Sequence, residues 1–356
     1  RQVLPEYLAL VDRATFHDQQ ARRADELLNR LKESGVFIDR YYFDGDPRTC
    51  YGETPAAPAQ SLTDLAMRYP DHRLLIFSDG AGLMHPITGR PQRWLEKFSD
   101  WNERALLTPE FPEQWGYRES ALAGQDFMVM PATQAGLAVL IESMQRNLTF
   151  SVSPADGAAA YPELLAQRPM LYLEQNEPEP AKVEQLCRQL MNYLGDEGFY
   201  WLCACAVYPM LGWDLTIYLG YRLLDDAGQK LITEERLLRL ARLPWLRYGM
   251  MPNWWRLRLI QEMGRQGETA VRKALQDLLE SAIEEPGQGF ILDVARTPGL
   301  KRRHWRRILK FLKTTPEESG MHDYVFLTYM SGRRPRRLAV GVPNVLRRFF
   351  SNRTKT

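Results

Sequence analysis

Long hydrophobic runs are missing from this sequence of 356 residues. No segment approaches the about 18 consecutive apolar residues that a membrane-spanning helix needs, and no secretory signal peptide is visible. We therefore expect a cytoplasmic protein. Because the first residue is Arg1 rather than Met, we also expect the sequence to be a piece of a longer polypeptide.

Cysteine and histidine are scarce, with four and five copies in the chain. The cysteines stand at positions 50, 187, 203 and 205, and no two of them form a Cys-x-x-Cys pair. Because a zinc site needs paired ligands at fixed spacing, the sequence predicts no metal centre of that kind. Buried, reduced thiols are the expected state of the four cysteines.

Three common sequence signatures are also absent. The chain has no Gly-x-x-x-x-Gly-Lys-Ser/Thr phosphate-binding loop and no Gly-x-Ser-x-Gly nucleophile elbow. The "GAG" at residues 80–82 lacks the third glycine and the acidic residue of a dinucleotide-binding fingerprint. The sequence therefore predicts no nucleoside triphosphatase, no hydrolase of the elbow type and no dinucleotide site.

The remaining composition is that of a globular protein, with 45% hydrophobic and 25% charged residues. Across residues 1–150, short apolar strands alternate with amphipathic helices. Strands are expected at 6–12, 36–43, 74–77, 104–109 and 126–133, and helices at 18–35, 61–70, 92–101 and 134–145. This alternation predicts an α/β class domain with a doubly wound, mostly parallel sheet.

The second part of the chain has a different pattern. Residues 151–181, rich in Ala, Pro, Glu and Gln, are expected to be a linker. Residues 182–356 read as a mainly helical domain whose tryptophans, spaced among leucines, predict core packing. Residues 322–343 have the pattern of a β-hairpin. Helices followed by a hairpin predict a winged-helix-like domain with a basic C-terminal tail.

Aspartates follow several of the expected strands. Asp12, Asp79 and the pair Asp44 and Asp46 each come at or just after a strand end. In a parallel sheet these side chains would gather along one edge, where α/β proteins bind ligands, and converged carboxylates can hold Mg²⁺. The alternative is that they cap turns and helix N-termini, which aspartate favours.

One resemblance accounts for this placement. "EYLALVDRATF" followed by "LLIFSDG" resembles the von Willebrand factor A family, which begins with a strand ending in Asp-x-Ser-x-Ser and later places Asp-Gly after a second buried strand. Asp12 and Asp79 match the aspartates of its metal-ion-dependent adhesion site, but Ala14 and Phe16 replace both serines, and Thr15 carries its hydroxyl out of register. The resemblance implies a degenerate member that is used for protein contacts.

A second resemblance competes with the first. Asp12, "YYFDGDP" and "SDGAGLMHP" are similar to the small PIN-like and NYN ribonucleases, which cluster strand-end aspartates around Mg²⁺ or Mn²⁺ to activate water on a phosphodiester. The segment "SDGAGLM" has only one carboxylate where two would be expected. This resemblance implies a nuclease with magnesium as its cofactor; without it, we expect no cofactor and no metal.

Charge is divided unevenly along the chain. Residues 296–356 contain 16 lysines and arginines against three acids, whereas residues 1–295 contain 30 basic and 41 acidic residues. Such a tail is typical of a surface for phosphate, lipid headgroups or an acidic protein, although it can also be a solvated face. The candidate anion-binding residues are Arg302, Arg303, Arg306, Arg307, Arg333, Arg334, Arg336 and Arg337.

These observations favour a non-enzymatic regulatory or interaction module of a larger bacterial signalling or defence protein. In this hypothesis the strand-end face, including Asp12, Thr15, Asp44, Asp46 and Asp79, recognises a protein partner, and the basic tail contacts an anionic surface or leads toward a membrane. A magnesium-dependent nuclease and a nucleic-acid-binding module are the alternatives.

Overall fold

The computed structural model describes residues 6–54, 58–146, 160–208 and 210–284. The expected hairpin at 322–343 and all eight candidate anion-binding arginines lie outside these ranges, so the winged-helix-like domain stays a prediction. Residues up to Gly267 form one compact unit, and the chain from Glu268 belongs to a second.

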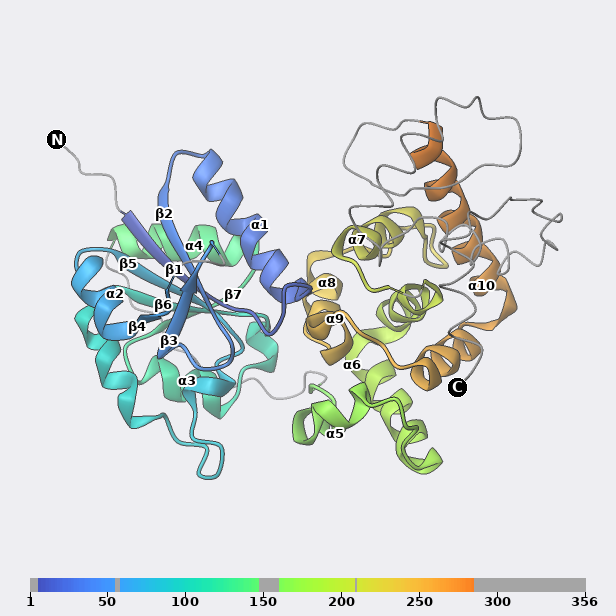
Figure 1. The fold of residues 1–356 in the computed structure, drawn as a ribbon, viewed down its shortest axis with the longest axis horizontal. Coiled ribbons are helices and arrows are strands. Elements are labelled where there is room, and N and C mark those ends of the chain that lie inside the picture. The colour runs from blue at the N-terminus through green and yellow to red at the C-terminus, as the bar shows by residue number, and fades with distance from the viewer. Residues whose placement is uncertain (1–5, 55–57, 147–159, 209, 285–356) are drawn as a thin grey trace, which may run out of the picture. The chain divides into compact units, whose positions relative to one another are not determined.

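A seven-stranded, mostly parallel sheet forms the centre of the first unit (Figure 1). Its strand order is β4-β3-β2-β1-β5-β6-β7. The five strands β2, β1, β5, β6 and β7 are parallel, whereas β3 and β4 extend one edge in antiparallel pairing. The strands are β1 (Glu6–Asp12), β2 (Phe37–Phe43), β3 (Thr49–Gly52), β4 (Gln60–Ser61), β5 (Arg73–Phe77), β6 (Arg104–Thr108) and β7 (Met128–Pro131). The expected α/β class with a mostly parallel sheet is confirmed.

Helices cover both faces of the sheet. Successive residues of a strand point to opposite faces, so Tyr7, Ala9 and Val11 of β1 pack with α1 (Gln19–Glu33) and α4 (Gln134–Arg146). Leu8 and Leu10 belong to the core of the other face, which contains side chains of α2 (Leu62–Arg68), α3 (Tyr117–Ala123) and the 3₁₀ helix η2 (Arg93–Asp100). Because both faces are buried, β1 is an unbroken apolar run.

Several short elements differ from the expectation. The sequence pattern did not predict β3, β4 or α3, and the helix expected at 92–101 is the 3₁₀ helix η2. Strands of four and two residues and a helix of seven residues are too short to show a hydrophobic period. Two further 3₁₀ helices, η1 (Ala81–Leu83) and η3 (Pro112–Gln114), lie in loops that follow β5 and β6.

The rest of the described chain is helical. It contains α5 (Glu163–Gln167), η4 (Pro169–Leu173), α6 (Pro180–Val207), α7 (Trp213–Arg222), α8 (Glu234–Ala241), α9 (Pro244–Tyr248) and α10 (Asn253–Glu284). The first two of these elements lie in the segment expected to be a linker, and Leu165, Tyr172 and Leu173 are buried there.

Glycines divide the two longest helices. Gly195 in α6 has φ 71° and ψ 172°, and Gly264 in α10 has φ 69° and ψ 169°. Side chains other than glycine rarely adopt such positive φ values, so each glycine marks a sharp turn between two helical halves.

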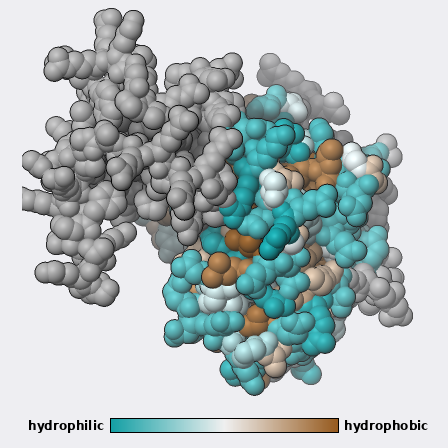
Figure 2. Space-filling model, turned by 90° about the vertical axis from the view of Figure 1, so that its right-hand side faces the viewer, coloured by the Kyte–Doolittle hydropathy of each residue, from teal (hydrophilic) through white to brown (hydrophobic). Residues whose placement is uncertain are grey.

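Aromatic side chains fill the core of the helical part. Trp201, Trp245 and Trp255 are fully buried, which confirms the expectation of core packing for these three. Trp213 and Trp254, of which the same was expected, are only half-buried. On the face shown in Figure 2, hydrophobic residues form small patches separated by hydrophilic residues. No helix among the described residues is long and apolar enough to cross a membrane.

Candidate functional site

Three strand ends meet at one edge of the sheet, as the sequence predicted. Asp12 ends β1, Asp44 follows the last residue of β2, and Asp79 lies two residues beyond β5. Because β2, β1 and β5 are adjacent and parallel, their carboxyl ends open at the same side of the sheet. The side chains of the three aspartates nevertheless have different surroundings.

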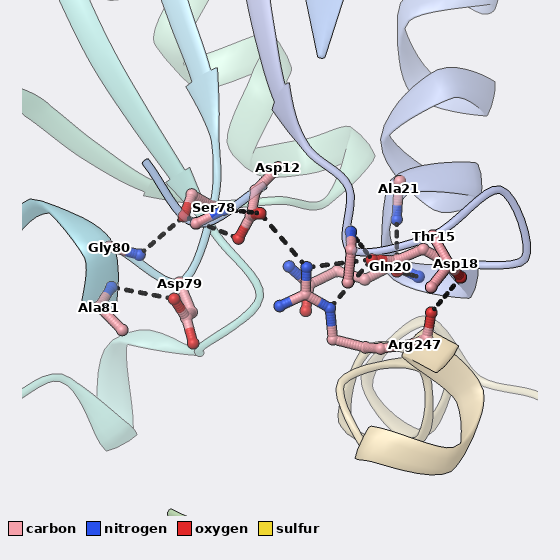
Figure 3. A network of polar contacts seen from close by, with 12 residues as sticks. Asp12, Thr15, Asp18, Gln20, Ala21, Ser78, Asp79, Gly80, Ala81 and Arg247 are labelled. Atoms are coloured by element: carbon pink, nitrogen blue, oxygen red, sulfur yellow. Dashed lines mark hydrogen bonds and ion pairs between the residues drawn. The ribbon is translucent and has the colours of Figure 1, made fainter. Parts of the chain in front are cut away.

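The Asp12 carboxylate is buried and has several partners (Figure 3). Its Oδ1 accepts a hydrogen bond of 3.0 Å from the backbone N–H of Gly45, and its Oδ2 accepts one of 3.3 Å from the Ser78 hydroxyl. The Nη2 atom of Arg247 lies 3.4 Å from Oδ1. Burial raises the pKa of Asp12 above its ordinary value, although the Arg247 guanidinium opposes the shift.

Arg247, on α9, joins Asp12 to the start of α1. Its Nε and Nη2 atoms each lie 3.0 Å from Oδ2 of Asp18. Asp18 is the N-cap of α1: its Oδ1 accepts hydrogen bonds from the backbone N–H groups of Gln20 and Ala21. One guanidinium therefore pairs with both a strand-end carboxylate and a helix-cap carboxylate. Burial alone would lower the pKa of Arg247, but Asp12, Asp18 and Asp79 raise it, so Arg247 stays charged.

The Thr15 hydroxyl faces the same helix. It donates a hydrogen bond of 2.9 Å to the backbone carbonyl of Arg247 and accepts one from the N–H of His17. The predicted site residue Thr15 thus binds another part of its own chain.

The sequence left open whether Asp79 binds a ligand or caps a turn, and the structure shows that it caps a turn. Its Oδ1 accepts a hydrogen bond of 2.9 Å from the N–H of Ala81, so its carboxylate caps the turn that follows β5. Burial would raise the pKa of Asp79, but the guanidinium groups of Arg242, Arg118 and Arg247 outweigh this effect and hold the pKa below its ordinary value. Asp79 therefore stays ionised within a group of arginines.

Asp44 and Asp46 lie farther along the same edge. Asp44 is exposed. Asp46 forms an exposed ion pair with Arg48, 2.6 Å from Oδ2 to Nη2, and the hydrogen bonds from Arg48 lower the pKa of Asp46. Neither carboxylate contacts Arg247, so the four predicted aspartates do not form one cluster.

A second buried ion pair lies beside the first. The Nη1 atom of Arg242, just past the end of α8, is 2.6 Å from Oε1 of Glu110, and both side chains are almost fully buried. The guanidinium also lies over the ring of Tyr161, 4.2 Å from its centroid. Asp79 is among the groups that raise the pKa of Arg242, so the two ion pairs belong to one electrostatic network.

Helix α8 packs against the two helices α1 and α4 that cover one face of the sheet. Leu238 is fully buried in the same core cluster as α1 and α4. Glu234, at the start of α8, pairs with Arg23 of α1 and accepts a hydrogen bond of 3.0 Å from the N–H of Gln134. The carboxyl edge of the sheet is therefore covered by helices of the same chain at the ends of β1 and β5, and it stays open near Asp44.

The sequence analysis did not identify four participants in this network: Asp18, Glu110, Arg242 and Arg247. A signal for Arg242 and Arg247 was present in "RLARLPWLRYG", where both interrupt an apolar helical stretch and neither has an acidic residue within four positions. An arginine in such a stretch needs a carboxylate from elsewhere in the fold.

A metal ion does not suit this arrangement. Within residues 6–54, 58–146, 160–208 and 210–284, no group of three or more His, Cys, Asp or Glu side chains could hold one. The carboxylates that meet at the edge of the sheet already share the guanidinium of Arg247, which supplies the positive charge that a cation would bring. The residues present therefore do not fit the magnesium ion that the nuclease resemblance implies.

Comparisons with protein-family models, with curated proteins and with solved structures find no match to this chain.

Proposed function

We propose that this chain is a non-enzymatic interaction module of a larger bacterial signalling or defence protein. Its strand-end aspartates bind helices of the same chain rather than a metal or a substrate. The observation that carries this proposal is the position of Arg247, whose guanidinium lies within ion-pair distance of both Asp12 and Asp18.

The von Willebrand factor A resemblance supports the same proposal. Asp12 and Asp79 follow two neighbouring parallel strands, where that resemblance places them. The two positions that would be serines in that family are Ala14 and Phe16, which have no oxygen ligand to offer. A degenerate domain of this kind would retain the scaffold for protein contacts without the metal.

An external partner would bind where the edge remains open. Asp12 and Asp18 are buried, whereas Asp44 and Phe16 are exposed. We therefore assign protein recognition to the part of the edge near Asp44. We also propose that the basic tail contacts an anionic surface, either a nucleic acid or a membrane, through the arginines between positions 302 and 337.

A nuclease assay tests this proposal against the enzyme alternative. The full chain is incubated with single-stranded RNA and single-stranded DNA in the presence of Mg²⁺ or Mn²⁺, next to the double variant Asp12→Asn/Asp79→Asn. We expect no cleavage above that of the double variant. Divalent-ion-dependent cleavage that the double variant lacks would establish the nuclease instead.

A second experiment tests the interaction itself. Proximity labelling in a bacterial host is compared between the native chain and a Phe16→Glu variant, which introduces a charge on the open part of the edge. We expect a defined set of labelled proteins that is lost in the variant, while the variant's thermal unfolding is unchanged. Identical labelling by both chains would contradict the placement of the partner surface.

A further inference from the structure

A groove lies at the open part of the sheet edge. It has a volume of about 460 Å³ and is formed by the loop between β1 and α1 together with the ends of β2 and β3. Sites that accept a side chain or a small ligand commonly have volumes of this order. Its principal lining residues are Arg13, Phe16, Tyr42, Asp44, Tyr51 and Glu53; we call it the Arg13 groove.

Aromatic rings hold the guanidinium of Arg13 in place. Its central carbon lies 3.6 Å from the ring centroid of Tyr42 and 5.0 Å from that of Phe16. The Tyr42 ring is itself fixed, because its hydroxyl donates a hydrogen bond of 2.9 Å to Asp25. Stacking on a ring uses the face of a guanidinium and leaves the N–H groups at its edge free to donate.

Arg13 differs in this respect from the other arginines of the site. Arg242 and Arg247 are each paired with a carboxylate. Within the described part of the chain, Arg13 forms no ion pair, and its side chain donates no hydrogen bond. The groove therefore contains an oriented, half-buried cation whose hydrogen-bonding groups have no partner among the described residues.

We propose that the Arg13 groove binds a carboxylate side chain on a segment of a partner protein. This proposal rests on the proposed function and specifies its binding site. A carboxylate matches the planar fork of a guanidinium and can accept two parallel hydrogen bonds from it. Phe16 and Tyr51 both line the groove and are 70% and 50% exposed. Exposed aromatic rings beside an arginine are typical of protein interfaces.

The charges around the groove favour a protein over a nucleic acid. Asp44 and Glu53 also line it, and both are exposed. Glu53 has a cation of its own, because its Oε1 lies 3.6 Å from Nε of Arg40. A chain of phosphates would bring several negative charges beside Asp44, whereas one acidic side chain can pair with Arg13 while its neighbours in the segment face Asp44. The groove thus selects for an isolated carboxylate, and it favours a basic or neutral residue next to it.

Peptide selection tests the proposal. A random linear heptapeptide display library is panned against the full chain, and selected peptides are then titrated by fluorescence anisotropy. We expect the selected peptides to be enriched in Asp or Glu. Changing that acid to its amide should weaken binding by at least about tenfold, because the charge-assisted hydrogen bonds to the guanidinium are lost. Arg13→Met should weaken binding to a similar extent, and Phe16→Ala should also weaken it.

The matched control is Arg22→Met, because Arg22 is exposed on α1 and forms no ion pair within the described residues. The affinity of this variant for the selected peptides should equal that of the native chain. The acid-to-amide change in the peptide keeps the test valid even if Arg13→Met unfolds. Failure to select any peptide, peptides without an acid, or equal binding by Arg13→Met would each overturn the proposal. Displacement of the peptide by a single-stranded oligonucleotide or by inorganic phosphate would do the same. None of these outcomes affects the nuclease assay. A failure of the groove proposal can therefore be distinguished from a failure of the proposed non-enzymatic function.

Discussion

Arg247 of α9 pairs with Asp18, the N-cap of α1, across 229 residues of sequence. The same guanidinium reaches Asp12 at the end of β1. A helix start and a strand end are thus joined by one side chain from a distant helix. Because Arg247 pairs with the carboxylates of Asp12 and Asp18, these two groups are not available to bind a ligand at the edge of the sheet.

Removal of Arg247 is expected to destabilise the first unit strongly. In an Arg247→Met variant, Asp18 and Asp12 would remain buried without a cation. Breaking a buried pair from one side costs about 3–5 kcal/mol of the free energy of unfolding. Urea denaturation measures this loss. Arg22→Met, an exposed change on α1, should alter the free energy by no more than about 0.5 kcal/mol. If the two variants were equally stable, the Arg247 contact would have no structural role.

The pair formed by Arg242 and Glu110 is expected to be energetically coupled. A double-mutant cycle with Arg242→Met and Glu110→Gln should give an interaction free energy of about 1–3 kcal/mol, because the two side chains are buried 2.6 Å apart. The matched cycle uses Arg48→Met and Asp46→Asn, a pair with the same distance but about half exposed, and should give a much smaller coupling because solvent screens the two charges. Equal coupling in both cycles would show that burial does not strengthen the first pair.

The sheet and its aspartates were predictable because the signals are local. The run of apolar residues in β1, the periodic spacing in α1 and the aspartates after strand ends can all be read within about 15 residues of sequence. The alternative that aspartates cap turns was also correct at two positions, since Asp79 accepts a hydrogen bond from the N–H of Ala81 and Asp46 accepts one from the N–H of Arg48.

The partners of those aspartates were not predictable in the same way. Nothing in the sequence near Asp12 indicates that its cation is Arg247, because the choice depends on how α8 and α9 pack against the carboxyl edge of the sheet. Predicting a site from strand ends alone assumes that this edge is open. In this protein α8 and α9 pack against the edge at Asp12. The carboxylate there therefore pairs with Arg247 of the same chain and not with a ligand.

Gly82 is expected to tolerate no side chain. A Cβ atom at this position would lie 1.6 Å from the carbonyl oxygen of Gly45, the residue whose N–H binds Asp12. Gly82→Ala should therefore push the two loops apart and destabilise the fold by about 1–3 kcal/mol or more. Gly212→Ala is the control, because a Cβ there meets nothing within 4 Å. Thermal unfolding compares the two variants, and equal midpoints would contradict the close approach of the loops.

Asp79 is expected to stabilise the protein in a pH-dependent manner. Its pKa is lowered from 3.8 because the charges of Arg242, Arg118 and Arg247 outweigh its burial. A carboxyl group whose pKa is lower in the folded state than in the unfolded state stabilises the fold when ionised. Its contribution is complete above the unfolded value, declines as the pH falls below about 4, and is lost below the folded pKa.

The variant Asp79→Asn isolates this contribution. The difference in the free energy of unfolding between the native chain and Asp79→Asn should be constant from pH 7 to about pH 5 and should shrink steadily below pH 4. Urea denaturation at pH 7, 5, 4 and 3 measures it. Asp71→Asn is the control, because Asp71 is exposed and its side chain has no hydrogen bond or ion pair in the described part of the chain; at pH 7 its effect should be much smaller than that of Asp79→Asn. A difference that grows as the pH falls would mean that burial, and not the three arginines, governs the ionisation of Asp79.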